Sequence, residues 1–275
     1  MSKYLLKIND KKMIYPDLDL GYILGIQDFC WCFDKTFSIT ELKNILKKTD
    51  NVFACLNRVI YEDELEDYKN LLLELDELNL KGIIIGDLAA LTYNLKTPLI
   101  LDQMHLNNSY LSINHYYNND NCGCYLTNDI TLEEINEIRK NTNATLLKDV
   151  FGYLHLSTSA RKLVSNYLSH FKIKDKSDIN YIKENNSNDE YIIKEDDFGT
   201  HILSGKVLDL FEEKDEIDVD YLVINSYLLE ENVVKNIIEA YVNNDKSKIE
   251  SVRKVIKTQK GFINRKTIYK VKHYE

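Results

Sequence analysis

Short, almost wholly apolar runs recur between amphipathic segments, and this alternation limits what the chain can fold into. The clearest run is Gly82-Ile83-Ile84-Ile85-Gly86, in which neither face would carry a polar side chain. A strand that is apolar on both faces is typical of a parallel sheet covered by helices. Similar runs lie at 22–26, 52–56, 99–101, 122–126, 145–154 and 221–224. The sequence therefore predicts parallel strands separated by helices.

The segments between these runs carry helix signals. Ser38 with Glu41, and Thr131 with Glu134, have the spacing of a capping box, in which the two residues satisfy each other's free backbone amides. Leu65, Tyr68, Leu72 and Leu75 share one face of a further helix. Strand and helix in this order predict an α/β fold of the TIM type, a (β/α)8 barrel.

The alternation breaks late in the chain. Two polar and aromatic runs, 181–184 and 190–195, flank an Asn-rich turn and predict a β-hairpin inserted near 181–195. A helix is predicted near 208–211, before the strand at 221–224. The barrel is therefore expected to be irregular, with the hairpin as an insertion.

Length and charge predict one domain followed by a basic C-terminal segment. The chain has 275 residues and is 44% hydrophobic, enough for one barrel over residues 1–245. The segment 246–275 holds ten Lys or Arg against two acidic residues, whereas the rest has 25 basic and 42 acidic residues. Such an end can contact RNA phosphates, dock on the acidic body or be a solvated face. All three alternatives remain open at this stage.

The sequence favours a cytoplasmic protein. Its first residues lack the apolar stretch of a signal peptide, and no run approaches the length of a membrane span. The five cysteines are odd in number and are expected to stay reduced, so disulfide bonds are not predicted.

Polar side chains cluster just after the second to fifth predicted strands. In a barrel these strand ends converge on one face, where they could line one pocket. A structural role is the alternative, since Asp87 and Asp129 also suit helix caps or turns. The candidate pocket residues are Asn57, Asp87, Gln103, His105, Asn128 and Asp129.

Other reactive residues give weaker signals. His105 and His155 could move protons, or be packed histidines. Cys30-Trp31-Cys32 and Cys122-Gly123-Cys124 would each point two sulfurs to one strand face, which could build a four-sulfur metal site. Because the two strands would lie far apart in a barrel, packed thiols and no metal are expected. Three serines, Ser157, Ser159 and Ser165, lack a base at a fixed spacing, so no catalytic residue is identified.

Several segments in order along the chain resemble the collagenase-like peptidase family of unassigned mechanism, peptidase family U32. They are Gly21 to Ser38, Asn57 to Leu65, Gly86-Asp87-Leu88, Gln103-Met104 with Asn108-Ser109, Asp129 to Ile138, Val150 to Leu168, the hairpin, Tyr221 to Tyr241 and Lys260-Gly261-Phe262. The resemblance implies a barrel. It also implies collagen degradation, or hydroxylation of RNA bases such as tRNA uridine or of ubiquinone precursors, commonly with an iron-sulfur cluster on four cysteines.

This chain departs from the family pattern at several charged or cysteine positions. His155 and Lys162 stand where the resemblance implies cysteines, and no cysteine follows Cys124. Trp31 stands in place of an arginine and Asn107 in place of a histidine. The segment Leu222 to Tyr227 replaces one that usually contains lysine, glutamate, glycine and arginine.

These departures predict a divergent, degenerate member without an iron-sulfur cluster or other cofactor. It would act as an accessory in tRNA uridine hydroxylation, with a cysteine-bearing relative and RNA as partners, the RNA held by the basic C-terminal segment. Whether the chain is itself an enzyme stays open. A peptidase of the same family and a non-catalytic barrel that binds a small ligand or a protein are the alternatives.

Overall fold

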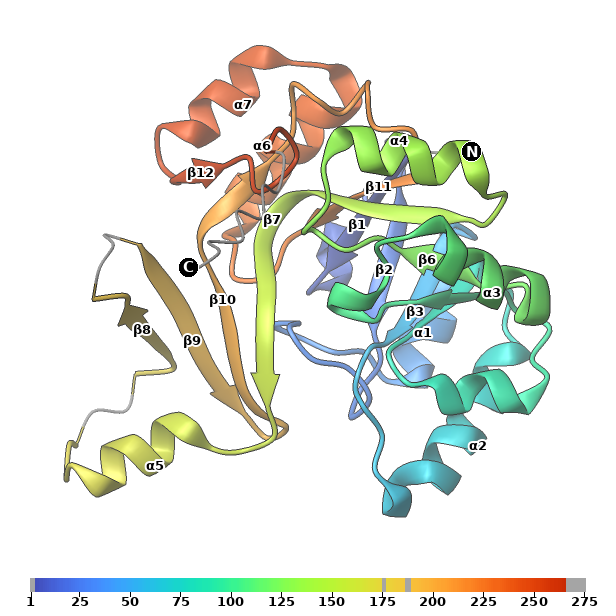
Figure 1. Ribbon diagram of the computed structural model, residues 1–275, viewed down its shortest axis with the longest axis horizontal. Helices are drawn as coiled ribbons and strands as arrows, with labels where there is room; N and C mark the ends of the chain where they lie inside the picture. Colours follow the sequence, from blue (N-terminus) through green and yellow to red (C-terminus); the bar gives the residue numbers. More distant parts are fainter. Residues whose placement is uncertain (1–2, 175–176, 186–188, 266–275) are drawn as a thin grey trace, which may run out of the picture.

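Eight parallel strands close into a barrel in the computed structural model, which describes residues 3–174, 177–185 and 189–265 (Figure 1). Each strand pairs in parallel with the next along the chain, and β11 closes the ring by pairing with both β7 and β1. The predicted TIM-type barrel is confirmed. The strands of the ring are β1 (Tyr4–Ile8), β2 (Gly21–Gly25), β3 (Val52–Leu56), β4 (Gly82–Ile85), β5 (Leu99–Leu101), β6 (Gly123–Tyr125), β7 (Leu146–Ser159) and β11 (Tyr221–Asn225).

The first strand of the ring was not predicted from the sequence. The run at 22–26, expected to be the first strand, is the second, and β1 precedes it with the sequence Tyr-Leu-Leu-Lys-Ile. Lys7 interrupts the apolar run of β1, which hides the strand from a search for uniformly apolar segments. With β1 included, the ring is complete.

Helices cover the outside of the ring, except the helix at 163–170, which packs against the antiparallel strands outside the ring (Figure 1). The two predicted capping boxes are confirmed: Ser38 and Thr131 each accept a hydrogen bond from the amide three residues on, and the glutamates at those positions bond back. None of the described helices has both the length and the apolar character needed to cross a bilayer. The helices are η1 (Lys11–Met13), α1 (Ile39–Leu46), η2 (Glu62–Glu64), α2 (Leu65–Asp76), η3 (Leu88–Tyr93), η4 (Met104–Leu106), α3 (Tyr110–Asp120), α4 (Leu132–Asn141), α5 (Leu163–His170), α6 (Glu231–Asn243) and α7 (Lys246–Arg253).

An antiparallel arm projects from the ring. β7 continues past the barrel and pairs with β10 (Gly199–Asp209), which pairs with β9 (Glu190–Asp196), which in turn pairs with β8 (Ile179–Lys183) (Figure 1). β8 and β9 are the predicted hairpin, which is confirmed. The helix predicted near 208–211 is wrong, because these residues end β10 and enter a turn. A short strand, β12 (Thr258–Gln259), pairs with the other end of β10.

The described part of the basic C-terminal segment, residues 246–265, contacts acidic groups of the body. Arg253 forms ion pairs with Asp209 and Glu212 at 2.7 Å each. Lys260 forms ion pairs with Glu212 and Glu213, and the latter is 2.8 Å long. Asp209 is buried, so removing Arg253 would leave a buried carboxylate at the end of β10 without its ion-pair partner on α7.

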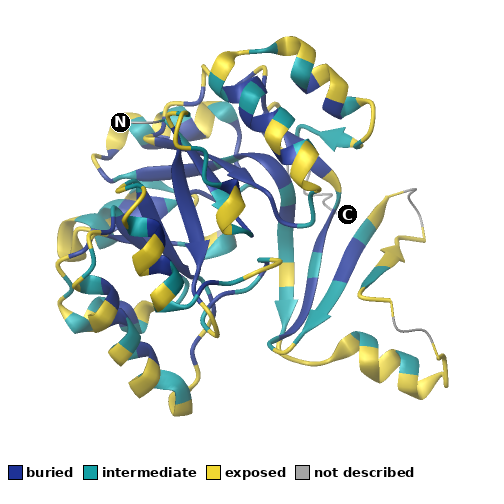
Figure 2. Ribbon diagram, turned by 180° about the vertical axis from the view of Figure 1, so that it is seen from behind, coloured by how far each residue is buried: buried dark blue, intermediate teal, exposed yellow. Residues whose placement is uncertain are grey.

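The strands of the ring are mostly buried, whereas the helices around it are buried only in part (Figure 2). The buried hydrophobic side chains form two main layers. The larger layer lies between the ring and its helices. The smaller fills the inside of the barrel with apolar side chains, so that the ring is a packed core and not a pore. The buried interior residues are Leu5, Ile23, Phe53, Cys55, Ile84, Ile100, Leu147, Tyr221 and Val223.

Candidate functional site

Side chains inside the barrel change from apolar to polar toward the carboxyl ends of the strands. Alternate residues of a strand point to the same side, so a residue two positions beyond an interior residue also faces inward. On three strands the interior residue is apolar, and the residue two positions further along is charged. The pairs are Leu5 and Lys7 on β1, Ile100 and Asp102 at the end of β5, and Leu147 and Asp149 on β7.

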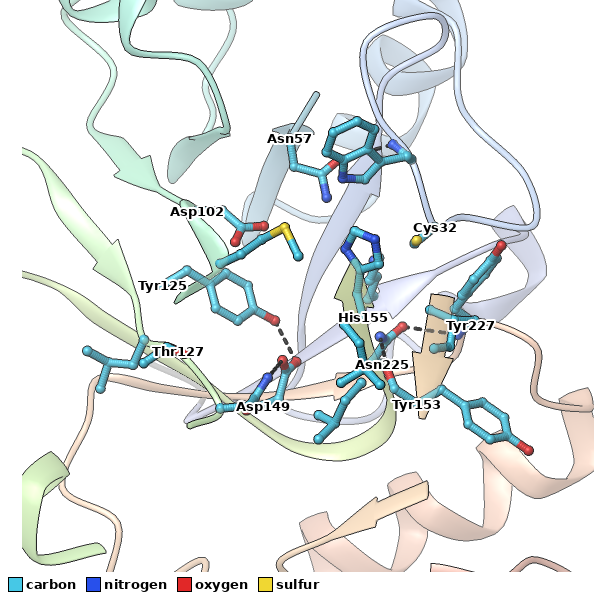
Figure 3. A pocket seen from close by; sticks show the side chains of 18 of the residues that line it. Cys32, Asn57, Asp102, Tyr125, Thr127, Asp149, Tyr153, His155, Asn225 and Tyr227 are labelled. Atoms are coloured by element: carbon cyan, nitrogen blue, oxygen red, sulfur yellow. Dashed lines mark hydrogen bonds between the residues drawn. The ribbon is translucent and has the colours of Figure 1, made fainter. Parts of the chain in front are cut away.

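The charged residues line a cavity of about 120 Å³ at the rim of the barrel (Figure 3). The apolar interior layer closes its floor, with Ile23 and Ile84 among the lining residues. This is the face on which barrels of this type carry their sites. The polar residues that line the cavity with Lys7, Asp102 and Asp149 include Asn57, Tyr125, Thr127, Asn128, Asp129, His155 and Asn225.

Asp149 is held by two neutral donors. The Tyr125 hydroxyl donates to one carboxylate oxygen at 2.7 Å, and the Asn128 side-chain amide donates to the other at 2.9 Å (Figure 3). Burial first, and the Asp149 charge second, raise the pKa of Tyr125 well above its ordinary value. Tyr125 therefore stays protonated and keeps donating, which fixes the carboxylate in one orientation.

A buried lysine, Lys148, fixes the orientation of the Asn128 side chain. The Lys148 ammonium donates to the side-chain oxygen of Asn128. This bond also sets the orientation of the Asn128 amide, whose nitrogen must then face Asp149. Burial lowers the pKa of Lys148 to about 8, while the charges of Asp149 and Asp129 oppose that shift.

Asp102 is the residue of the cavity best suited to exchange a proton near neutral pH. Burial raises its pKa to about 6, and the like charge of Asp149 adds to the rise. The Lys7 charge, the Met104 amide and the Asn57 side chain act in the opposite direction. A carboxyl group with such a pKa can donate a hydrogen bond in one protonation state and accept one in the other.

Three of the six residues predicted from the sequence line this cavity: Asn57, Asn128 and Asp129. Asn57 accepts a hydrogen bond from the Trp31 amide at 3.1 Å, which ties the loop after β2 to the rim. The hydroxyl of Thr127 donates to Asp129 at 3.3 Å.

The structure does not bring the other predicted residues into the described lining. The Asp87 carboxylate caps η3 by accepting from the Ala89 amide at 2.9 Å, and it also accepts from the Ile60 amide at 3.0 Å. This is the structural alternative considered for Asp87. Gln103 precedes η4 and is absent from the described lining. His105 lies in η4, and its side chain falls outside the part of the chain that the structure describes.

Sequence reasoning missed Lys7, Asp102, Tyr125 and Asp149. Lys7, Tyr125 and Asp149 lie on strands, whereas the predicted residues follow them; Asp102 directly follows β5, but the prediction named Gln103 and His105 there instead. A charged residue at an inward position of an otherwise apolar strand was the available signal. Counting in steps of two from Leu147 would have reached Asp149.

Cysteine and histidine side chains occupy one side of the rim. Cys32, His155 and His201 each offer a ligand atom within 4.8 Å of the others, and no other group of three or more potential metal ligands occurs among the described residues. Cys30 and Cys32 lie in the loop after β2, with Cys32 in the left-handed region at φ 58°, so their sulfurs do not share a strand face as the four-sulfur hypothesis requires. The two Cys-x-Cys pairs therefore do not form a four-sulfur site.

An iron-sulfur cluster on four cysteines, which the resemblance implies for other members, does not fit this donor set. The five cysteines are buried and distributed over the loop after β2, over β3 and around β6. The one cluster of potential ligands in the described chain contains a single cysteine, and the other two members are histidines.

Two of the three serines considered as nucleophiles, Ser159 and Ser165, have structural partners. The Ser165 hydroxyl donates to Glu195, and the same carboxylate accepts from the Val164 and Ser165 amides at the start of α5. The Ser159 hydroxyl accepts from the Arg161 amide at 3.2 Å. These contacts cap a helix and shape a turn.

Solved structures with a remote likeness are known. The spore cortex-lytic enzyme SleL of Bacillus megaterium QM B1551 is 10% identical, with a TM-score of 0.38 over 86% of this chain and 73% of that one. SleL of Bacillus cereus is 9% identical, with a TM-score of 0.40 over 87% and 74%. A likeness at these scores carries no weight for the function of this chain.

Sequence comparison is more informative. The tRNA hydroxylation protein P2 of Bacillus subtilis (strain 168) is 23% identical over 255 residues, which cover 81% of this chain and 82% of that protein. The family model described as peptidase family U32 matches residues 23–272, which include most of the ring, the arm and the described C-terminal segment. On this match the chain belongs to peptidase family U32.

Proposed function

We propose that this chain is a divergent family member that takes part in the hydroxylation of tRNA uridine, and that its rim cavity holds the base. The observation that carries the proposal is the polar cavity at the carboxyl ends of the strands, with Asp102 and Asp149 facing it. The 23% identity to a tRNA hydroxylation protein supports the choice of substrate. Such a role belongs in the cytoplasm.

The size of the cavity suits one aromatic ring. At about 120 Å³ it is close to the roughly 150 Å³ of an engineered cavity that binds benzene. It is much smaller than the roughly 300–1,000 Å³ of pockets for drug-sized ligands. A single pyrimidine would have to leave its stack in the RNA to enter, as in other enzymes that act on bases.

The hydrogen-bonding groups of the cavity suit a uracil edge. Uracil presents one imide N–H between two carbonyl oxygens, so it needs an acceptor flanked by donors. The fixed carboxylate of Asp149 supplies the acceptor. Asn57 and the protonated form of Asp102 supply donors, while the ammonium of Lys7 can stabilise negative charge on a carbonyl oxygen.

Binding of RNA phosphates requires basic side chains near the rim or in the basic C-terminal segment. Lys246, Lys254 and Lys257 are exposed in the described part of the C-terminal segment. We include them in the proposal as phosphate-binding groups. Replacing all three by glutamine should reduce the salt dependence of tRNA binding by roughly one unit of log affinity per log salt for each phosphate that is no longer neutralised.

The test starts from the gene. Deleting it in the source organism should lower the hydroxyuridine content of tRNA, measured by mass spectrometry of digested tRNA, and the wild-type gene should restore it. An unchanged content in the deletion strain would contradict the proposal. A cysteine-bearing family relative, expected as a partner, should be recovered with the tagged protein from the same cells.

Binding is tested separately on the purified protein. Uridine should raise the melting temperature, because a ligand that binds only the folded state stabilises it by mass action. Stabilisation by uridine together with an unchanged hydroxyuridine content would favour the non-catalytic binding barrel. Absence of binding to both uridine and unmodified tRNA would contradict the placement of the base in the cavity.

A further inference from the structure

The group of Cys32, His155 and His201 lies on the rim beside the cavity and comes from three different elements. Cys32 belongs to the loop after β2, His155 to β7 and His201 to β10. Their potential ligand atoms lie within 4.8 Å of one another, and Figure 3 shows the Cys32 sulfur beside the His155 ring. Cys32 and His201 are buried, with 4% and 0% exposure, and His155 is partly exposed.

Both imidazoles turn one nitrogen toward the Thr158 hydroxyl, which a bound ion would have to displace. The Thr158 hydroxyl lies 2.7 Å from Nε2 of His155 and 2.8 Å from Nδ1 of His201. Thr158 and His201 face each other across the β7–β10 ladder, so the fold itself fixes this convergence. Trp31 packs against both rings, with centroid distances of 5.9 and 5.7 Å, which limits their rotation.

The far side of His201 carries a carboxylate. Its Nε2 atom is buried and makes no aligned hydrogen bond in the described chain, although a carboxylate oxygen of Asp196 lies 3.1 Å away. Metal-binding histidines usually turn their second nitrogen toward a carboxylate or a carbonyl group, which fixes the tautomer and raises the basicity of the ligand. Asp196, at the end of β9, stands in the position of such a supporting group.

We propose that Cys32, His155 and His201 bind one divalent transition-metal ion of the zinc type. One thiolate and two imidazoles are the nitrogen and sulfur donors that Zn²⁺ prefers, and three protein ligands leave a fourth tetrahedral position open. Because Cys32 and His155 also line the rim cavity, an ion held by them would lie beside it.

This ligand set replaces the expectation of a chain without metal. It uses one cysteine and two histidines, so it differs from a cluster on four cysteines. The site also stands apart from the proposed uridine function, because the metal can bind whether or not the cavity accepts a base.

The test is a titration of the purified, metal-free protein with Co²⁺ under reducing conditions. One equivalent should produce visible bands of tetrahedral cobalt together with a thiolate-to-metal band in the near ultraviolet. An equivalent of Zn²⁺ should then remove both. A wild-type protein that shows neither band and is not stabilised by Zn²⁺ in a thermal melt would overturn the proposal.

Variants separate the site from adventitious binding. Cys32→Ser should abolish the thiolate band, and His155→Gln, at a partly exposed position, should weaken binding without unfolding the protein. Cys122→Ser is the matched control, since this buried cysteine is outside the group. Asp196→Asn should weaken affinity by about 10- to 100-fold, as loss of a supporting carboxylate does. Equal binding by wild type and Cys32→Ser would also overturn the proposal.

Discussion

The inside of the barrel has two layers, built on the same strands but different in chemistry. The lower layer, with Leu5, Ile100 and Leu147, is apolar and closed, whereas two residues further along each strand the side chains are Lys7, Asp102 and Asp149. Burying apolar groups stabilises the fold, while burying charges costs free energy unless they are well paired. We therefore expect the lower layer to contribute most of the stability, and the proposed function places the ligand against the upper layer.

The largest effect on stability is expected in the lower layer. Phe53 is buried and meets Tyr221 edge to face, with ring centroids 5.3 Å apart. Phe53→Ala should lower the free energy of unfolding by about 3–5 kcal/mol, because it leaves a cavity in a packed core. Urea denaturation of the two proteins measures this difference. A decrease below about 1 kcal/mol would show that the lower layer is not the stabilising one.

In the upper layer, replacing Asp102 is expected to raise the free energy of unfolding instead of lowering it. The pKa of Asp102 is raised to about 6 in the fold, so the folded state binds its proton more tightly than the unfolded state does. Its contribution to stability is fully present below about pH 4 and is lost as the pH rises through 6. Asparagine does not ionise, so Asp102→Asn has no such loss of stability at high pH. The variant should be more stable than wild type at pH 7.5 by up to about 3 kcal/mol.

Denaturation at two pH values checks the sign for Asp102. The difference between Asp102→Asn and wild type should shrink as the pH falls toward 4. Asp63→Asn, an exposed residue of η2, is the control and should show little difference at either pH. A variant that is less stable than wild type at pH 7.5 would mean that Asp102 is held mainly by favourable contacts.

A smaller effect on stability is expected from the neutral Tyr125 hydroxyl, which donates a hydrogen bond to the Asp149 carboxylate. Tyr125→Phe keeps the ring and removes the hydroxyl that donates to Asp149 at 2.7 Å. Stability should fall by about 1.5–3 kcal/mol, the usual range for a hydrogen bond to a charged group. A thermal melt of both proteins gives the difference. No change would indicate that water replaces the hydroxyl and that Asp149 is better hydrated than its contacts suggest.

Local signals in the sequence predicted much of the fold. The capping boxes at Ser38 and Thr131 and the hairpin at 181–195 each depend on residues close together in the chain, and all three were found. The helix predicted near 208–211 failed because an apolar end of a long antiparallel strand has no period that separates it from a short helix. The strand β1 was missed because Lys7 interrupts it.

The candidate site was predicted only in part. Asn57, Asn128 and Asp129 were found because they follow strands, whereas Asp149 required the inward and outward positions of β7 to be assigned. The position of His201 was out of reach for a different reason. It meets Thr158 and His155 only through the pairing of β10 with β7, a contact between residues more than 40 positions apart that no local pattern records.

The most direct test of the two-layer account is the hydroxyuridine content of tRNA in a deletion strain that carries Asp102→Leu, Asp149→Asn or the control Asp63→Asn. Removing the Asp149 charge that accepts from the base, or the donor that Asp102 supplies, should cost about 1.5–3 kcal/mol of interaction, or at least about tenfold in activity. The account predicts that the control restores the wild-type content and that both cavity variants, present at wild-type protein levels, fall at least about tenfold short. Full restoration by both cavity variants would contradict it.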